Sequence, residues 1–177
     1  MNRRAQGFLA FGLATVLVAV VVGLGLRSAV MHLMLRDIPS VSAAGLASSP
    51  FLAAAAPRWS YSGVLPAEGS PADWMSVSFP EAGAPRVAIT VVLSRGEGAV
   101  NLIGLVDHAT GKFQAGLTSS SVGFPIFEKL SGVVRGPALV DGAPAVRIEV
   151  TGEPRPGVRG SQPRRWAGVL FAEGFGH

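Results

Sequence analysis

An uncharged run of 22 residues near the N-terminus, Ala5–Leu26, constrains this chain more than any other feature. At about 1.5 Å of rise per residue, a helix over this run spans about 33 Å, enough to cross a hydrocarbon core of about 30 Å. The apolar part of a cleaved signal peptide is shorter, about 7–15 residues, and ends at a small-residue site. This run is followed directly by Arg27. We therefore expect an uncleaved transmembrane helix over residues 5–26, with a cleaved signal peptide as the alternative.

The charges that flank the run predict its orientation. Arg3 and Arg4 precede it, whereas Arg27 and Arg36 follow it and are partly offset by Asp37. Positive charge is retained preferentially on the cytoplasmic side of a membrane. We therefore expect residues 1–4 to form a cytoplasmic stub and the C-terminal domain to be exported.

The overall basic charge argues for membrane orientation rather than for nucleic-acid binding. The net charge is +4 and the isoelectric point is about 10.6. Arg3, Arg4, Arg27 and Arg36 account for the whole excess, since the other 11 basic residues face 11 acidic ones. A nucleic-acid-binding domain concentrates Lys and Arg on one face. The expected partners are therefore the lipid bilayer and other membrane proteins, and no nucleic acid.

The chain beyond the apolar run divides into two parts. Helical character continues to Arg36, where Asp37–Pro39 interrupts it because the residue before a proline disfavours the helical conformation. Ser40–Ala56 is rich in Ala and Ser. We expect a helical connector over residues 27–57 and one exported domain over residues 58–177.

Apolar residues in this domain repeat with the period of a strand. Met75–Phe79 and Val146–Val150 alternate apolar and polar side chains, which predicts half-buried strands. Val87–Leu93 and Ala99–Val106 are more continuously apolar, which favours central strands buried on both faces.

Turn-forming residues separate these strands. Arg95–Gly98 and Asp107–Gly111 fit tight hairpins, and Trp166–Phe171 is expected to form a last short strand. The predicted fold is α+β, with the transmembrane helix followed by a short helical segment and an antiparallel β-meander.

Residues that could carry chemistry are scattered along the sequence. His32, His108 and His177 have no local ligand spacing, and the carboxylates occur singly. Asp107 and His108 could join a metal or proton-transfer site if the fold supplied partners, or could be exposed turn residues. The absence of cysteine removes thiolate metal sites, disulfides and Cys nucleophiles. We expect no catalytic residue, no cofactor and no metal.

A basic segment near the C-terminus is the candidate interaction surface. Residues 152–165 read as a loop rich in Pro, Gly and Arg, in which Arg155, Arg159, Arg164 and Arg165 face Glu153 alone. This loop could meet an acidic partner or anionic headgroups, or could be a solvated spacer.

Several short segments resemble a known family. They are Ala47–Leu52, Ser62–Val64, Phe79–Gly83, Gly98–Ile103, Gly111–Phe113 and Leu117. In this order, after an N-terminal anchor, they resemble the cytochrome oxidase complex assembly family. The resemblance implies an α+β domain that binds other membrane proteins and assists assembly, with no catalytic residues to transfer.

The layout of the whole chain, Met1–His177, is similar to that of the small accessory proteins of bacterial magnetosome membranes. That resemblance implies an indirect role in magnetite crystal growth or size, with the domain in the vesicle lumen. We expect a non-enzymatic single-pass accessory protein of this kind. The alternatives are an assembly factor for a respiratory oxidase and a membrane-anchored metal-binding or enzymatic domain.

Overall fold

The computed structural model separates the chain into two compact units, Met1–Asp37 and Ile38–His177. It describes residues 3–51, 59–67, 70–80, 85–121, 127–157 and 162–174. Each unit is described below by itself.

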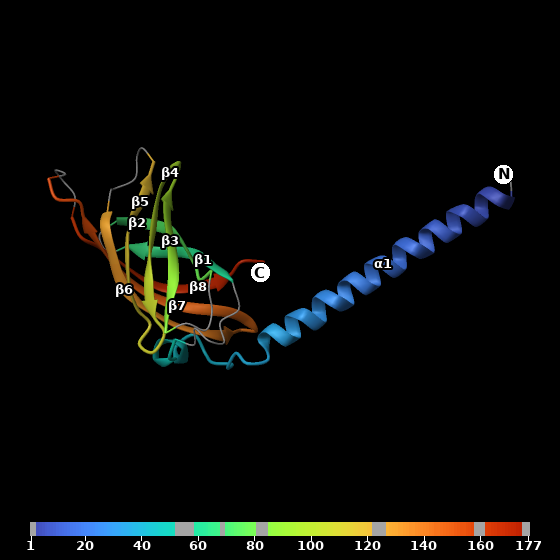
Figure 1. Ribbon diagram of the computed structural model, residues 1–177, viewed down its shortest axis with the longest axis horizontal. Helices are drawn as coiled ribbons and strands as arrows, with labels where there is room; N and C mark the ends of the chain where they lie inside the picture. The colour runs from blue at the N-terminus through green and yellow to red at the C-terminus, as the bar shows by residue number, and fades with distance from the viewer. Residues whose placement is uncertain are drawn as a thin grey trace. The chain divides into compact units, whose positions relative to one another are not determined.

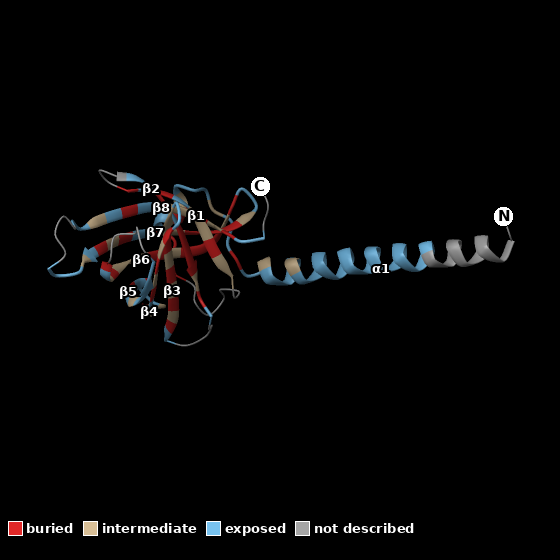
Figure 2. Cartoon of the chain, turned by 90° about the horizontal axis from the view of Figure 1, so that it is seen from above, coloured by how far each residue is buried: buried red, intermediate tan, exposed pale blue. Residues whose placement is uncertain are grey.

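The first unit is a single helix, α1 (Arg3–Leu35), of 33 residues. Its stretch Leu13–Leu35 has a mean hydropathy of 2.2 and is long enough to cross a membrane. Large apolar side chains from Leu13 to Met34 are exposed, as the pale blue of Figure 2 shows. The prediction of one N-terminal membrane-spanning helix is confirmed at the level of length and composition, which a signal sequence also satisfies. The helix continues past Arg27 and ends before Asp37, as expected.

The second unit is a closed β-barrel in which each strand pairs antiparallel with the next and the last pairs with the first (Figure 1). Its strands are β1 (Ser60–Ala67), β2 (Ser70–Ser78), β3 (Arg86–Arg95), β4 (Gly98–Asp107), β5 (Lys112–Ser120), β6 (Phe127–Val140), β7 (Ala143–Pro154) and β8 (Arg164–Ala172).

The prediction of an α+β fold is therefore wrong. No helical layer packs on the described strands, since the sheet covers its own apolar face by closing on itself. The prediction of a short helical segment after the transmembrane helix is also wrong. Among the described residues that follow α1, the one helical element is the 3₁₀ turn η1 (Gly45–Ser48). Residues 52–58, which include the end of the predicted connector, lie outside the described residues.

Both predicted hairpins are confirmed. Gly96 and Glu97 join β3 to β4, and the turn that ends at Gly111 joins β4 to β5. Gly96 and Gly111 have φ values of 57° and 69°, which glycine adopts without steric cost. The prediction that β3 and β4 are buried on both faces is wrong, because buried and less buried residues alternate along each strand. The long strand β6 was missed.

The barrel interior is filled with apolar side chains from all eight strands. Figure 2 colours the buried residues of the strands red. An eight-stranded barrel is about wide enough for side chains to fill its interior. One end is packed by aromatic rings: Phe51 and Phe79 have centroids 5.3 Å apart, and Tyr61 lies 6.2 Å from Phe79 and 6.4 Å from Trp59.

The segment around η1 packs on the outside of the barrel, whereas Phe51, which follows it, joins the apolar cluster of the interior. Ser40 and Phe51 form isolated parallel bridges with Leu139 and Gly136 of β6. Leu46 of η1 is fully buried in a second cluster, whose other buried members are Ala138, Val140 and Ala145. The register of β6 against β7 shifts between Arg135 and Ala138. A shift of one residue changes which face a side chain meets, which explains why Ala138 lies under this segment and not in the barrel interior.

Substitution of Gly132 tests how closely β6 packs against β5 and β7. A Cβ at this position would meet the carbonyl oxygen of Glu149 and come within 2.9 Å of the Phe113 ring, whereas a Cβ at Gly116 meets nothing within 4 Å. We expect Gly132→Ala to lower the free energy of unfolding by about 2 kcal/mol, because the new methyl group forces the backbone apart. Gly116→Ala is the matched control and should leave stability unchanged or slightly higher. Urea unfolding of the full chain in detergent, followed by tryptophan fluorescence, measures both. Equal stability of the two variants would contradict this packing.

Candidate functional site

A fully buried carboxylate, Asp73, lies at the centre of a polar network at one end of the barrel. Its side chain is 0% exposed. Its Oδ1 accepts a hydrogen bond from Arg95 Nε at 2.6 Å. Its Oδ2 accepts from Trp166 Nε1 at 2.8 Å and from Arg164 Nη1 at 3.4 Å. Arg95 also donates from Nη2 to the carbonyl oxygen of Pro71. We call Asp73, Arg95, Arg164 and Trp166 the Asp73 network.

The network crosses the line along which the barrel closes. Asp73 is on β2 and Arg95 on β3, whereas Arg164 and Trp166 are on β8, and β1 lies between β8 and β2. A buried ionised carboxylate is tolerated only when charged partners and hydrogen bonds replace its lost hydration. Both oxygens of Asp73 have such partners. The arrangement therefore holds β2, β3 and β8 together.

The predicted basic surface is divided by the strands. Arg164 is the first residue of β8, and its partly buried side chain belongs to the Asp73 network. Arg165 is the next residue on that strand and is exposed. Arg155 is exposed just after β7. Arg159 lies outside the described residues. The structure therefore assigns Arg164 to the barrel interior, so of the described arginines of this segment Arg155 and Arg165 are the exposed ones.

Asp107 and His108 organise the turn between β4 and β5. Asp107 Oδ1 accepts hydrogen bonds from the backbone N–H of Thr110 at 2.9 Å, from its hydroxyl at 3.0 Å and from the N–H of Ala109 at 3.0 Å. The bonds from Thr110 lower the pKa of Asp107 below its usual value. His108 Nδ1 donates to the carbonyl oxygen of Pro85 at 2.6 Å. The described part of the chain contains no grouping of three potential metal-ligating His, Cys, Asp or Glu residues.

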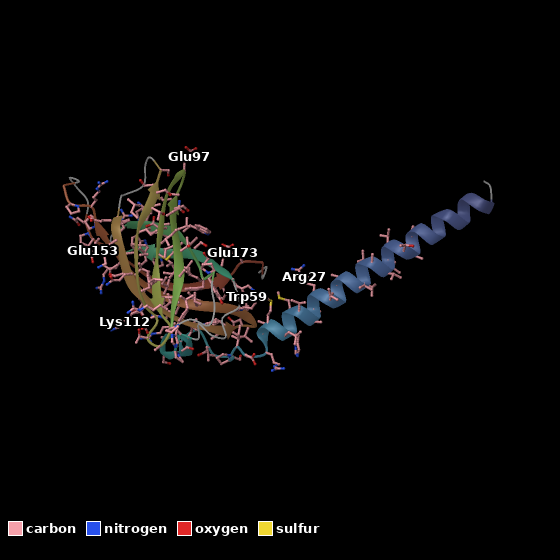
Figure 3. All side chains as sticks on the ribbon, viewed as in Figure 1. Arg27, Trp59, Glu97, Lys112, Glu153 and Glu173 are labelled. Carbon is pink, nitrogen blue, oxygen red and sulfur yellow. The ribbon has the colours of Figure 1, made fainter. Side chains whose placement is uncertain are left out.

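The outside of the barrel has two chemically different sides. The outward-facing residues of β6, β7 and β8 include Lys129, Arg135, Arg147, Glu149, Glu153 and Arg165. Those of β3, β4 and β5 carry no charge between the strand ends, and we call them the uncharged face. They are Ala88, Thr90, Val92, Ser94, Ala99, Asn101, Ile103, Leu105, Gln114, Gly116 and Thr118. Charges border this face at both ends, with Glu97 and Lys112 at opposite ends of the barrel in Figure 3.

Two large apolar side chains stand out on the uncharged face. Ile103 and Leu105 of β4 are 53% and 52% exposed. Their cross-strand neighbours are small or polar: Thr90 and Gly116 oppose Ile103, and Ala88 and Gln114 oppose Leu105. A groove of about 790 Å³ continues from this face across β5 and β6, with Leu105 on one side and Ser131 and Thr151 on the other.

Sequence reasoning missed the Asp73 network, although a signal was present. Asp73 is in phase with Met75 and Val77, and Arg95 is in phase with Val91 and Leu93, which all face the interior. A charged residue in phase with buried apolar positions therefore marked this site. The uncharged face could also have been identified from the sequence, because the outward positions of three consecutive strands carry no charged residue. That step requires knowing that each strand has one buried face.

Comparisons with family models, with curated proteins and with solved structures gave no match to this chain. The fold and the apolar helix define it as a closed antiparallel β-barrel domain preceded by one helix that could span a membrane.

Removing the carboxylate tests the Asp73 network. We expect Asp73→Ala to lower the free energy of unfolding by about 3 kcal/mol, because Arg95 and Arg164 lose their buried counter-charge. Glu97→Ala, at the exposed β3–β4 turn, is the control and should change stability by less than about 0.5 kcal/mol. Thermal unfolding of the full chain in detergent compares them. Similar unfolding of both variants would show that the network contributes little.

Proposed function

We propose that this protein is a membrane-tethered, non-enzymatic accessory protein whose barrel binds another membrane protein through the uncharged face. The observation that carries the proposal is the pair Ile103 and Leu105, both about half exposed on a face without charged side chains. The apolar helix α1 supports the tether.

The composition of the face decides what kind of partner fits it. Interface cores are depleted of charged residues, since every charge that is covered must be desolvated. The uncharged face can be covered without that cost. A charged partner surface over Ile103 and Leu105 would lose its hydration there and meet counter-charges only at the ends of the face. The partner surface is therefore itself apolar and uncharged where it meets Ile103 and Leu105.

The chemistry of the buried polar groups supports a non-enzymatic role. Catalytic carboxylates need access to a substrate proton or reacting atom. Asp73, the buried carboxylate of the described residues, is bonded on both oxygens to Arg95, Arg164 and Trp166. Asp107 is engaged in its own turn. These groups act in the proposal as structural supports of the binding face.

For the membrane system, we propose the magnetosome membrane, with an indirect effect on magnetite crystal growth or size. The support is the similarity of whole-chain layout to magnetosome accessory proteins. Assembly of a respiratory oxidase is the alternative. The barrel differs from the α+β domain implied by the resemblance to the oxidase assembly family, which leaves this alternative with less support.

Site-specific cross-linking through an introduced cysteine tests the binding face. The sequence contains no native cysteine, so each introduced thiol is the only one in the protein that can react. We expect Leu105→Cys to form a cross-linked product with another membrane protein in native membranes, because the partner covers this position. Ala167→Cys, exposed on the outside of β8, is the matched control and should give none. A magnetosome protein or an oxidase subunit in the product would identify the membrane system. Equal products at both positions, or none at either, would contradict the proposed face.

Cysteine labelling also tests the proposed topology. In sealed vesicles with their cytoplasmic side outward, we expect Asn2→Cys to react with an impermeant maleimide. Glu97→Cys, at an exposed turn of the barrel, should react after detergent is added. Mass spectrometry should find the protein near 18.2 kDa if the helix is retained. The reverse labelling pattern would contradict the orientation, and a smaller soluble product would identify α1 as a signal peptide.

A further inference from the structure

Two arginines face each other across neighbouring strands on the charged side of the barrel. Arg135 of β6 and Arg147 of β7 are direct register partners. The residues that flank Arg147, Val146 and Ile148, are fully buried in the barrel core. Because successive side chains of a strand point to opposite faces, Arg147 faces outward. Like charges placed directly opposite each other destabilise a sheet, so the pair calls for a compensating negative charge.

The described residues supply only part of that charge. Arg147 Nε lies 3.5 Å from Glu149 Oε1, an ion-pair distance. The Glu149 side chain is 63% exposed, whereas that of Arg147 is 32% exposed. Arg147 Nε is buried and makes no hydrogen bond within the described part of the chain. A buried donor without an acceptor costs about 1–3 kcal/mol. Among the described residues, one carboxylate therefore stands against two guanidinium groups, and its contact with Arg147 Nε is an ion pair without hydrogen-bond geometry.

A small cavity adjoins these groups. It has a volume of about 90 Å³ and is lined by Ala47, Val133, Arg135, Arg147 and Glu149. Ala47 belongs to η1, which Leu46 anchors against β6 and β7. The cavity is thus bounded by the strand pair on one side and by the segment that follows the membrane helix on the other. It can hold a group of the size of a phosphate and is too small for a sugar or a base.

We propose that this cavity binds one phosphate group between Arg135 and Arg147. Guanidinium groups match the oxygen geometry of phosphate and bind it by charge-assisted hydrogen bonds. A phosphate oxygen would accept from the buried Nε of Arg147 and would neutralise the like-charge pair. The phosphate is either that of a lipid headgroup or free inorganic phosphate. The site lies on β6 and β7, apart from Ile103 and Leu105 of β4, and is independent of the function proposed above.

Thermal unfolding of the full chain in a phosphate-free, non-ionic detergent tests the site. At a phosphate concentration about tenfold above Kd, we expect the midpoint of wild-type unfolding to rise by about 3–5 °C over that in chloride of equal ionic strength. Arg147→Gln should weaken phosphate binding at least about tenfold, which lowers the shift to about 1 °C or less. Arg165→Gln, an exposed arginine outside the cavity, is the matched control and should keep it.

A second arm distinguishes the source of the phosphate. Phosphatidylglycerol is added to the same micelles and compared with monoolein, which lacks a phosphate group. A shift with phosphatidylglycerol but not with inorganic phosphate identifies a lipid headgroup, and a shift with both identifies the phosphate group itself. In either case the shift must fall to about 1 °C or less in Arg147→Gln. If neither phosphate source stabilises the wild type, or if Arg147→Gln keeps the shift, the proposal is wrong.

The same variants separate binding from a structural role of the arginines. If Arg135 and Arg147 serve only the fold, Arg135→Gln should lower the unfolding midpoint without phosphate, which would overturn the proposal. In the proposed site, Arg135→Gln relieves like-charge repulsion. The phosphate-free midpoint of this variant should therefore be unchanged or higher, while its response to phosphate is lost.

Discussion

Closure of the barrel between its first and last strands is the constraint on which the rest of the domain depends. The register of β1 against β8 pairs Tyr61 with Ala172, Ser62 with Phe171 and Ala67 with Trp166, which leaves the middle of the seam without partners. Asp73 spans this seam, because it binds Arg164 and Trp166 of β8 from its place on β2. Burying that carboxylate is favourable only when all of these strands are in place. The network therefore couples closure of the sheet to the correct pairing of three strands.

The local parts of the fold were predictable from the sequence, and the closure was not. Alternating apolar residues and Gly-containing turns identified the hairpins around Gly96 and Gly111 because both signals lie within a few residues. Pairing of β1 with β8 joins residues about a hundred positions apart, and no local pattern encodes it. Strand β6 was missed because Gly136 and Pro137 interrupt it and because Ala138 packs outward, under Leu46.

The candidate sites differ in the same way. The basic character of the segment after Gly152 was evident from the sequence. The position of Arg164 was not, because its partly buried side chain lies beside Asp73, 91 positions earlier in the chain. The pairing of Arg135 with Arg147 depends on the register of β6 and β7, which a turn at Asp141 alone does not determine. The uncharged face depends on knowing that β3 and β4 have one buried face. In each case the missing information is which strand faces which, and in what register.

In the two proposals made above, division of the outer surface into an uncharged side and a charged side gives one small domain two kinds of recognition. The interior of the barrel is apolar throughout its middle and is packed by side chains, so the strands serve mainly as a rigid support. Charged groups on β6 to β8 can respond to ionic strength, whereas contacts made by Ile103 and Leu105 depend on apolar area and are insensitive to it. A partner and an anion could thus be bound at the same time without competing for the same groups.

A sheet that closes on itself also has a consequence for the membrane-tethered protein proposed above. Tethering to a surface raises the local concentration of neighbouring copies, and open sheets at high concentration join through the unpaired backbone groups of their outer strands. In this barrel each described strand has a hydrogen-bonded neighbour on both sides. Crowded copies therefore offer one another no free edge strand along which a fibril could start. Association is left to side chains, which mutation can alter while the scaffold stays the same.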